Sequence, residues 1–183
     1  NDETGKADTP KTKRRASVGI LMMLLVVLMT FIFSTLDNAV TLAHANGTID
    51  IGQWPRILLA FSGLAAGFVF DIKNRKYMGL IMYCIMILST ISIVILKLTG
   101  SFLVGLIVFY LSAGFFVVFF TSGFMELARH MRIPALWAGM GRAVNNITAV
   151  VIAGLVLNLL SSDSNLAVII LVLVLFVASS IVA

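Results

Sequence analysis

The stretch PRILLAFSGLAAGFVFDIKNRKYMGLIMYCIMILSTISIVIL, residues 55–96, contains two apolar runs separated by a short charged segment. The charged segment begins at Asp71 and ends with the basic pair Arg75 and Lys76. An α-helix needs about 20 apolar residues to cross a hydrocarbon core roughly 30 Å thick. The second run has this length and the first is slightly shorter, so the stretch predicts two membrane-spanning helices joined by a charged turn.

The whole chain repeats this pattern. Hydrophobic residues make up 60% of its 183 residues, and the mean hydropathy is +1.08, which exceeds what a soluble domain of this size can bury. The apolar runs are continuous, unlike the alternating strands of a membrane β-barrel. The sequence therefore predicts an all-α integral membrane protein with six transmembrane helices. The expected spans are Val18–Val40, Pro55–Phe70, Tyr77–Leu96, Phe102–Leu127, Ala135–Leu160 and Leu166–Ala183.

Basic residues indicate how the spans are oriented. Three clusters precede the first span, follow the second and follow the fourth, and six crossings place all three on one side. By the positive-inside rule that side is cytoplasmic. We therefore expect a multi-pass protein of the cytoplasmic membrane with both termini in the cytoplasm. The net charge of +5 reflects this topology, so no direct binding of nucleic acid is expected. The clusters are Lys6, Lys11, Lys13, Arg14 and Arg15; Lys73, Arg75 and Lys76; and Arg129 and Arg132.

The chain divides into two parts at its polar start. Residues 1–16 are polar and charged, which predicts a cytoplasmic tail or a linker. Residues 17–183 form the expected six-helix transmembrane domain. Because the chain begins with Asn1 and ends in an apolar run, we expect it to be a fragment of a larger protein.

No pattern typical of an enzyme or a metal site occurs in the sequence. Zinc, haem, P-loop, dinucleotide and catalytic-triad motifs are absent. His44 and His130 fall on opposite faces of the membrane in the predicted topology, so they cannot share a metal ion. We expect no cofactor and no enzymatic activity.

The turn after the second span carries a more specific signal. Gly67, Asp71, Arg75 and Lys76 resemble the signature loop of the major facilitator superfamily, G-x-x-x-D-x-x-G-R-K/R. Asn74 replaces the usual glycine, and asparagine tolerates a left-handed turn better than other residues with a side chain. The resemblance implies a six-helix half of such a transporter, built as a 3+3 inverted repeat. The polar lead-in favours the C-terminal half.

The resemblance also implies roles for these residues. Asp71 would be a gating acid that helps to hold one access state closed, and Gly67 would be a close-packing point. Arg75 and Lys76 would act as a charge relay and an anchor on the inner side. The plainer alternative is that Asp71 only caps a helix end and that the positive-inside bias alone explains the bases.

Polar residues inside the fifth span form a second candidate site. Polar and charged groups are costly in lipid, so they are expected to face the interior of the helix bundle. Arg142 is followed by Asn145 and Asn146 at i+3 and i+4, on neighbouring positions of the helix. Snorkelling of Arg142 to the headgroups is also compatible with its depth. Gly139 and Gly141 precede this stripe and would permit close approach of another backbone. We expect a contact with substrate or with a neighbouring helix.

The first span is far more polar in its outer half than in its inner half. Asp37 and Asn38 lie near the outer boundary, and Thr30, Ser34 and Thr35 extend the polar character inward. Asp37 could simply be solvated. The alternative that we favour is that this half of the helix lines an outward-facing vestibule, with Asp37 as a cation-binding or protonatable carboxylate.

These observations predict secondary active transport of a small solute by alternating access, with coupling to a proton or another cation. The expected partners are the lipid bilayer, a second six-helix half and the solute. A transporter-like membrane sensor fused to a cytoplasmic output module, such as a DNA-binding domain, is the alternative. A third possibility is a six-helix protein that dimerises to rebuild a full transporter.

Overall fold

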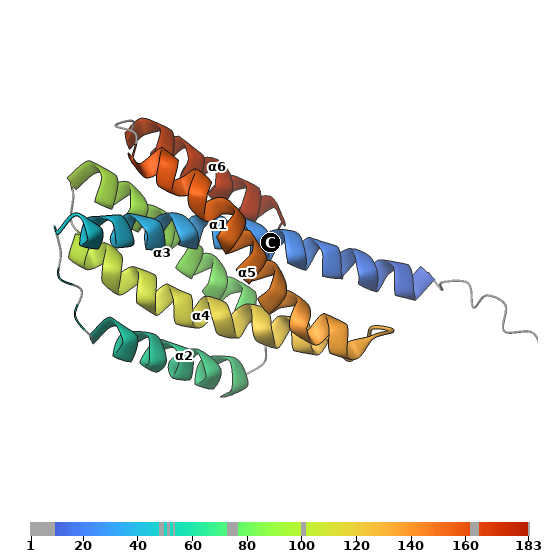
Figure 1. Ribbon diagram of the computed structural model, residues 1–183. Coiled ribbons are helices and arrows are strands. Elements are labelled where there is room, and N and C mark those ends of the chain that lie inside the picture. Colours follow the sequence, from blue (N-terminus) through green and yellow to red (C-terminus); the bar gives the residue numbers. More distant parts are fainter. Residues whose placement is uncertain are drawn as a thin grey trace, which may run out of the picture.

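The computed structural model describes residues 10–47, 50, 52, 54–72, 77–99, 102–161 and 165–182. Within this part of the chain all regular structure is helical (Figure 1). The six described helices are α1 (Pro10–Ala45), α2 (Trp54–Ile72), α3 (Met78–Thr99), α4 (Phe102–Ala128), α5 (Pro134–Ser161) and α6 (Asn165–Val182). The predicted helical class is thereby confirmed.

Proline and glycine mark several helix ends. Pro10 and Pro134 are the first residues of α1 and α5, where proline costs no hydrogen bond because the first amides of a helix have no partner within it. Gly47 follows the end of α1 with a φ of 69°, a left-handed conformation that glycine adopts without strain. The amide of Asn46 donates to the carbonyl of Leu42 at 3.0 Å and closes the last turn.

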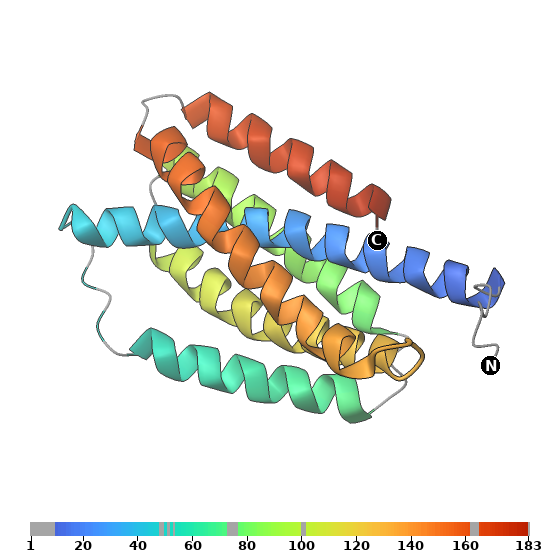
Figure 2. The same cartoon turned by 45° about the vertical axis from the view of Figure 1, so that its right-hand side comes forward.

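The first helix begins earlier than the expected span. It includes residues 10–16, which the sequence places in a polar tail or linker. Lysine, arginine and alanine are good helix formers, so the helix continues beyond the apolar stretch. In both views the start of α1 extends past the other helices (Figures 1 and 2).

Four of the described helices contain stretches long and apolar enough to cross a membrane: Ala16–Ala45, Met78–Thr99, Phe102–Ala128 and Pro134–Leu160. The apolar parts of α2 and α6, Ile57–Asp71 and Leu166–Val182, are shorter. The chain is therefore a helical protein with the features of a multi-pass membrane protein. The bounds of α4 and α5 agree with the expected spans to within one residue, because polar residues interrupt the apolar sequence there.

Consecutive helices run in opposite directions through one bundle (Figure 2). Two helices, α1 and α4, hold it together. The first helix, α1, packs against α5, α6, α4 and α3, and α4 packs against α2, α5, α3 and α1. At the margins, α2 packs against α4, whereas α6 packs mainly against α1 and α3. The start of α5 and the end of α4 lie at the end of the bundle where α1 begins (Figure 2).

Aromatic residues fill the centre between α1 and α4. The rings of Phe33 and Phe116 stack with centroids 4.8 Å apart, and the rings of Phe116 and Phe120 meet edge to face at 5.0 Å. Such pairs contribute roughly 0.5–1.5 kcal/mol beyond the area that they bury. Phe120 and Phe124 are fully buried. The aromatic residues of α4 thus fix its position against α1.

Small residues permit a close helix contact between α2 and α4. A Cβ atom built on Gly114 would lie 2.6 Å from the backbone nitrogen of Gly63 and 2.9 Å from the carbonyl carbon of Ser62. The hydroxyl of Ser62 also donates to the backbone carbonyl of Tyr110 at 3.0 Å. Ser62 and Gly63 of α2 thus contact Gly114 of α4, and these small residues let the backbones of the two helices approach directly.

We expect Gly114→Ala to destabilise the protein by about 1–3 kcal/mol, because the added methyl group forces α2 away from α4. Gly67→Ala is the matched control, since it has the same gain in helix propensity and its Cβ would meet no heavy atom within 4 Å. Thermal unfolding in detergent, followed by helical circular dichroism, measures both. Equal stability of the two variants would contradict the close contact.

Candidate functional site between α1 and α5

A polar contact joins the middle of α1 to the middle of α5. The hydroxyl of Thr30 lies 2.8 Å from Oδ1 of Asn145 and 2.6 Å from the carbonyl oxygen of Val26, one turn earlier. Thr30 is 3% exposed and Asn145 is half-buried. The two helices therefore meet through hydrogen bonds at a depth where lipid offers none.

The hydroxyl of Thr30 can serve both partners. It has one proton and two lone pairs. It donates to Oδ1 of Asn145, or it donates to the carbonyl of Val26 and accepts from Nδ2 of Asn145 when that amide is turned over. In both of these arrangements the side chains of α1 and α5 stay connected. Among the described residues, every buried side-chain nitrogen or oxygen has a hydrogen-bond partner.

The structure separates the three polar residues of α5. Asn145 turns toward α1, while Arg142 and Asn146 are exposed at the surface of the bundle. These two are four residues apart, so they occupy adjacent turns of one helix face. The three residues of the predicted polar stripe therefore have two environments: Asn145 forms a contact between helices, and Arg142 and Asn146 lie at the surface.

The second half of α1 carries further polar side chains. Nδ2 of Asn38 donates to the backbone carbonyl of Ser34 at 2.8 Å and approaches its hydroxyl at 3.0 Å. Both residues are half-buried, and Asp37 beside them is exposed. Thr35 is buried and donates to the carbonyl of Phe31 at 2.9 Å. An amide, a carboxylate and hydroxyl groups thus lie on this half of α1, and the hydroxyl of Thr35 is satisfied within the helix.

Of the four candidate residues around the charged segment, Gly67 and Asp71 are described, and both belong to α2. Asp71 is exposed at the end of α2, and Gly67 is half-buried one turn earlier. No heavy atom of the described residues would touch a Cβ on Gly67, so the close packing expected there is not made within this part of the chain. Arg75 and Lys76 lie outside the described residues.

The glycines near Arg142 differ in their surroundings. A Cβ on Gly141 would lie 2.6 Å from the ring of Phe124 and 3.1 Å from that of Phe120. At Gly139 it would meet nothing within 4 Å. Gly141 thus makes room for aromatic side chains of α4, and not for the second helix backbone that the sequence predicts at both glycines.

One polar contact and one ring contact have no specific signal in the sequence. Ser89 of α3 donates to Ser112 of α4 at 3.0 Å, and both are almost completely buried. The first part of α1 meets α5 where a Cβ on Gly19 would lie 2.5 Å from Cζ3 of Trp137. Isolated serine or glycine within an apolar run is the only sequence signal for such contacts, and it does not name the partner helix.

The described residues hold no group of three or more histidine, cysteine, aspartate or glutamate side chains that could bind a metal ion. Hydroxyl, amide and guanidinium groups instead make up the α1–α5 site. They can bind a polar or charged solute through hydrogen bonds, and they carry no nucleophile with an adjacent base. Comparisons with protein-family models, with curated proteins and with solved structures found no match.

Removal of the hydroxyl in Thr30→Val should destabilise the protein by roughly 0.5–1.5 kcal/mol, because the variant leaves Asn145 without this partner. A double-mutant cycle with Asn145→Leu should give a coupling energy of about 0.6 kcal/mol, and at most about 1.7. Stability is measured by unfolding in mixed detergent micelles.

The control pairs Thr90→Val with Asn145→Leu. Thr90 is buried in α3 and donates to the carbonyl of Met86 in its own helix, so its coupling to Asn145 should be close to zero. Equal couplings in the two cycles would show that the contact between Thr30 and Asn145 adds nothing specific.

Proposed function

We propose that this chain is a six-helix unit of a secondary transporter of the major-facilitator type, which works by alternating access against a second unit. In this proposal all six helices cross the cytoplasmic membrane, and the end that carries Arg129 and Arg132 faces the cytoplasm. The substrate is a small solute. The observation that carries the proposal is the way in which the first three helices pack against the last three.

Part of the helix packing supports an inverted repeat. If α1, α2 and α3 are equated with α4, α5 and α6, the contact of α1 with α5 corresponds to that of α4 with α2. The contact of α1 with α6 corresponds to that of α4 with α3, and the contact between α3 and α6 maps onto itself. Equivalent helices run in opposite directions (Figure 2), which is the relation within an inverted repeat.

The polar contacts follow the same exchange. Thr30 and Asn145 join α1 to α5, and Ser62 bonds to the backbone of Tyr110 to join α2 to α4. Both contacts tie a central helix to the helix beside it. The exchange fails for three pairs of helices. The packing of α4 on α5, of α1 on α3 and of α5 on α6 has no counterpart of similar extent between the described parts of α1 and α2, of α4 and α6, and of α2 and α3. These differences distinguish the α5 side of the bundle from the α2 side.

The proposed solute pathway runs along α1 and α5. Asn38 and Ser34 present polar groups in the outer half of α1, and Asn146 and Arg142 do so in the inner half of α5. Polar groups at these depths would be costly against lipid, and a polar cavity shared with a second unit removes this cost. Asp37 is the carboxylate available on this path for coupling to a proton or another cation.

Alternating access is tested with a cysteine at Asn146, in a background where exposed Cys84 is replaced by alanine. In proteoliposomes the new thiol should react with a membrane-impermeant reagent from one side without a proton gradient and from the other side with it. Val174→Cys in α6 is the control; that side chain is exposed on the bundle, and the proposal places it against lipid, so it should react from neither side.

Reaction of the Asn146 cysteine from one fixed side, with or without the gradient, would contradict transport by alternating access. It would favour the sensor hypothesis, in which the membrane domain reports to a cytoplasmic module.

The gating role of Asp71 gives a separate prediction. Asp71→Asn removes the charge at the end of α2 while keeping the size of the side chain. It should shift the balance of the two accessibility states of the Asn146 cysteine by about tenfold, which corresponds to roughly 1.4 kcal/mol. Asp50→Asn, in the exposed connection between α1 and α2, is the control. An unchanged balance in Asp71→Asn would leave this residue with a helix-capping role only.

A further inference from the structure

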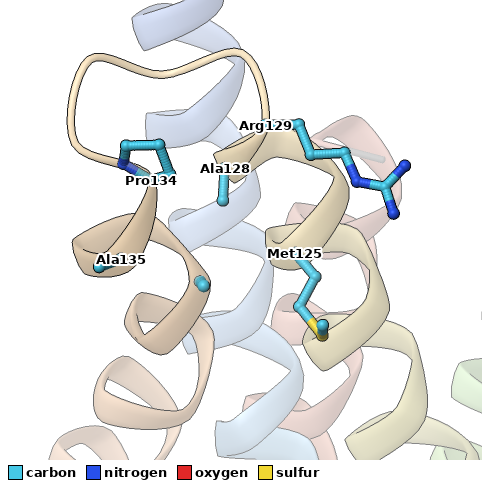
Figure 3. Close-up of a pocket in the computed structure, with 6 residues that line it drawn as sticks. Met125, Ala128, Arg129, Pro134 and Ala135 are labelled. Atoms are coloured by element: carbon cyan, nitrogen blue, oxygen red, sulfur yellow. The ribbon is translucent and has the colours of Figure 1, made fainter.

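A pocket lies where α4 ends and α5 begins, away from the contact between Thr30 and Asn145. Its volume is about 290 Å³. The end of α4 forms one wall and the first turns of α5 form the other (Figure 3). The lining residues are Met125, Ala128, Arg129, Pro134, Ala135 and Ala138.

The lining combines apolar walls with one cationic side chain. Five of the six residues carry only apolar side chains, and Met125 is 57% exposed. Arg129 directly follows the last residue of α4, and its guanidinium extends away from the wall formed by α5 (Figure 3). The apolar walls favour a ligand with an apolar part, because burial of apolar surface stabilises the complex. The guanidinium beside the pocket favours a negative group on that ligand.

The neighbouring charges have the same sign on balance. Arg132 is exposed on the connection between the two helices. Glu126 is the one acid in residues 125–138, against Arg129 and Arg132, so with neutral histidine this segment has a net charge of +1. This is also the end of the bundle where α1 begins and which the positive-inside rule places at the cytoplasmic leaflet. Anionic lipids are concentrated in that leaflet.

We propose that this pocket binds a phospholipid with an anionic headgroup. The apolar walls formed by Met125, Ala135 and Ala138 take part of an acyl chain. The guanidinium of Arg129 binds the phosphate by charge-assisted hydrogen bonds, and Arg132 adds to the attraction of the net negative headgroup. The lipid would join the end of α4 to the start of α5 at the membrane surface. This proposal does not depend on transport.

Trp137 provides a local reporter for the test. It is adjacent to Ala138 in α5, and Trp54 at the start of α2 is the other tryptophan of the chain. In a Trp54→Phe background the protein is reconstituted into phosphatidylcholine vesicles that contain increasing fractions of brominated phosphatidylglycerol or brominated phosphatidylcholine. Because bromine quenches tryptophan fluorescence only near contact, quenching reports lipid at this end of α5.

We expect half-maximal quenching at a several-fold lower fraction of phosphatidylglycerol than of phosphatidylcholine. The double variant R129Q/R132Q should remove this difference. The control Lys97→Gln changes a lysine in the last turn of α3, at the other end of the bundle, and should keep it. Ala138→Phe fills the pocket and should raise the fraction of phosphatidylglycerol needed; it keeps the proposal testable if the arginine variant does not fold.

Equal quenching by the two lipids would overturn the proposal, as would a preference for phosphatidylglycerol that survives in R129Q/R132Q. Inorganic phosphate at millimolar concentration distinguishes a lipid from free phosphate. If it abolishes the preference at constant ionic strength, the site binds phosphate and not a lipid. If chloride and phosphate have the same small effect, the lipid proposal stands.

Discussion

The structure depends on one constraint, which is that a lipid environment supplies no hydrogen-bond partners. Each backbone amide and carbonyl within a span must be satisfied inside the chain, and a helix does this by itself. The buried hydroxyls follow the same rule. Thr90 and Ser179 donate to the carbonyl four residues earlier in their own helices. The apolar helices can therefore carry hydroxyl groups without exposing an unsatisfied polar atom.

A few polar side chains have partners on another helix, and these determine which helices stay together. In lipid, the hydrophobic effect does not draw helices together, so packing and hydrogen bonds must do so. Ser89 and Ser112 join α3 to α4, and Thr30 and Asn145 join α1 to α5. Close approach at Gly114 completes the set by allowing α2 to reach α4. The bundle thus owes its arrangement to few residues, most of them small.

The two candidate sites differ in chemistry because they lie at different depths. The α1–α5 site lies within the spans, where amide and hydroxyl groups favour specific hydrogen bonds to a solute. The pocket of Met125, Ala128, Arg129, Pro134, Ala135 and Ala138 lies at the end of the bundle where α1 begins, and its apolar walls adjoin a cation. The proposed solute site and the proposed lipid site are therefore separate.

Much of the helical architecture could be predicted from the sequence. The ends of α4 and α5 follow from the change between apolar and polar residues, because transfer of a span into lipid depends on composition and length alone. The candidate residues were found by the same reasoning, since a polar group in an apolar run is conspicuous. Thr30 and Asn145 are both visible in this way, but neither indicates the other as its partner.

The sequence by itself determined the helical class and the approximate bounds of the helices, because both depend on local composition. Only the tertiary structure decided that Asn145 meets Thr30 while Asn146 and Arg142 are exposed, that Gly114 admits α2, and that Arg129 stands beside an apolar pocket. Helix positions three or four residues apart differ in direction by a fraction of a turn. Which of these positions faces another helix depends on contacts between residues that are distant in the sequence. Local composition does not determine those contacts.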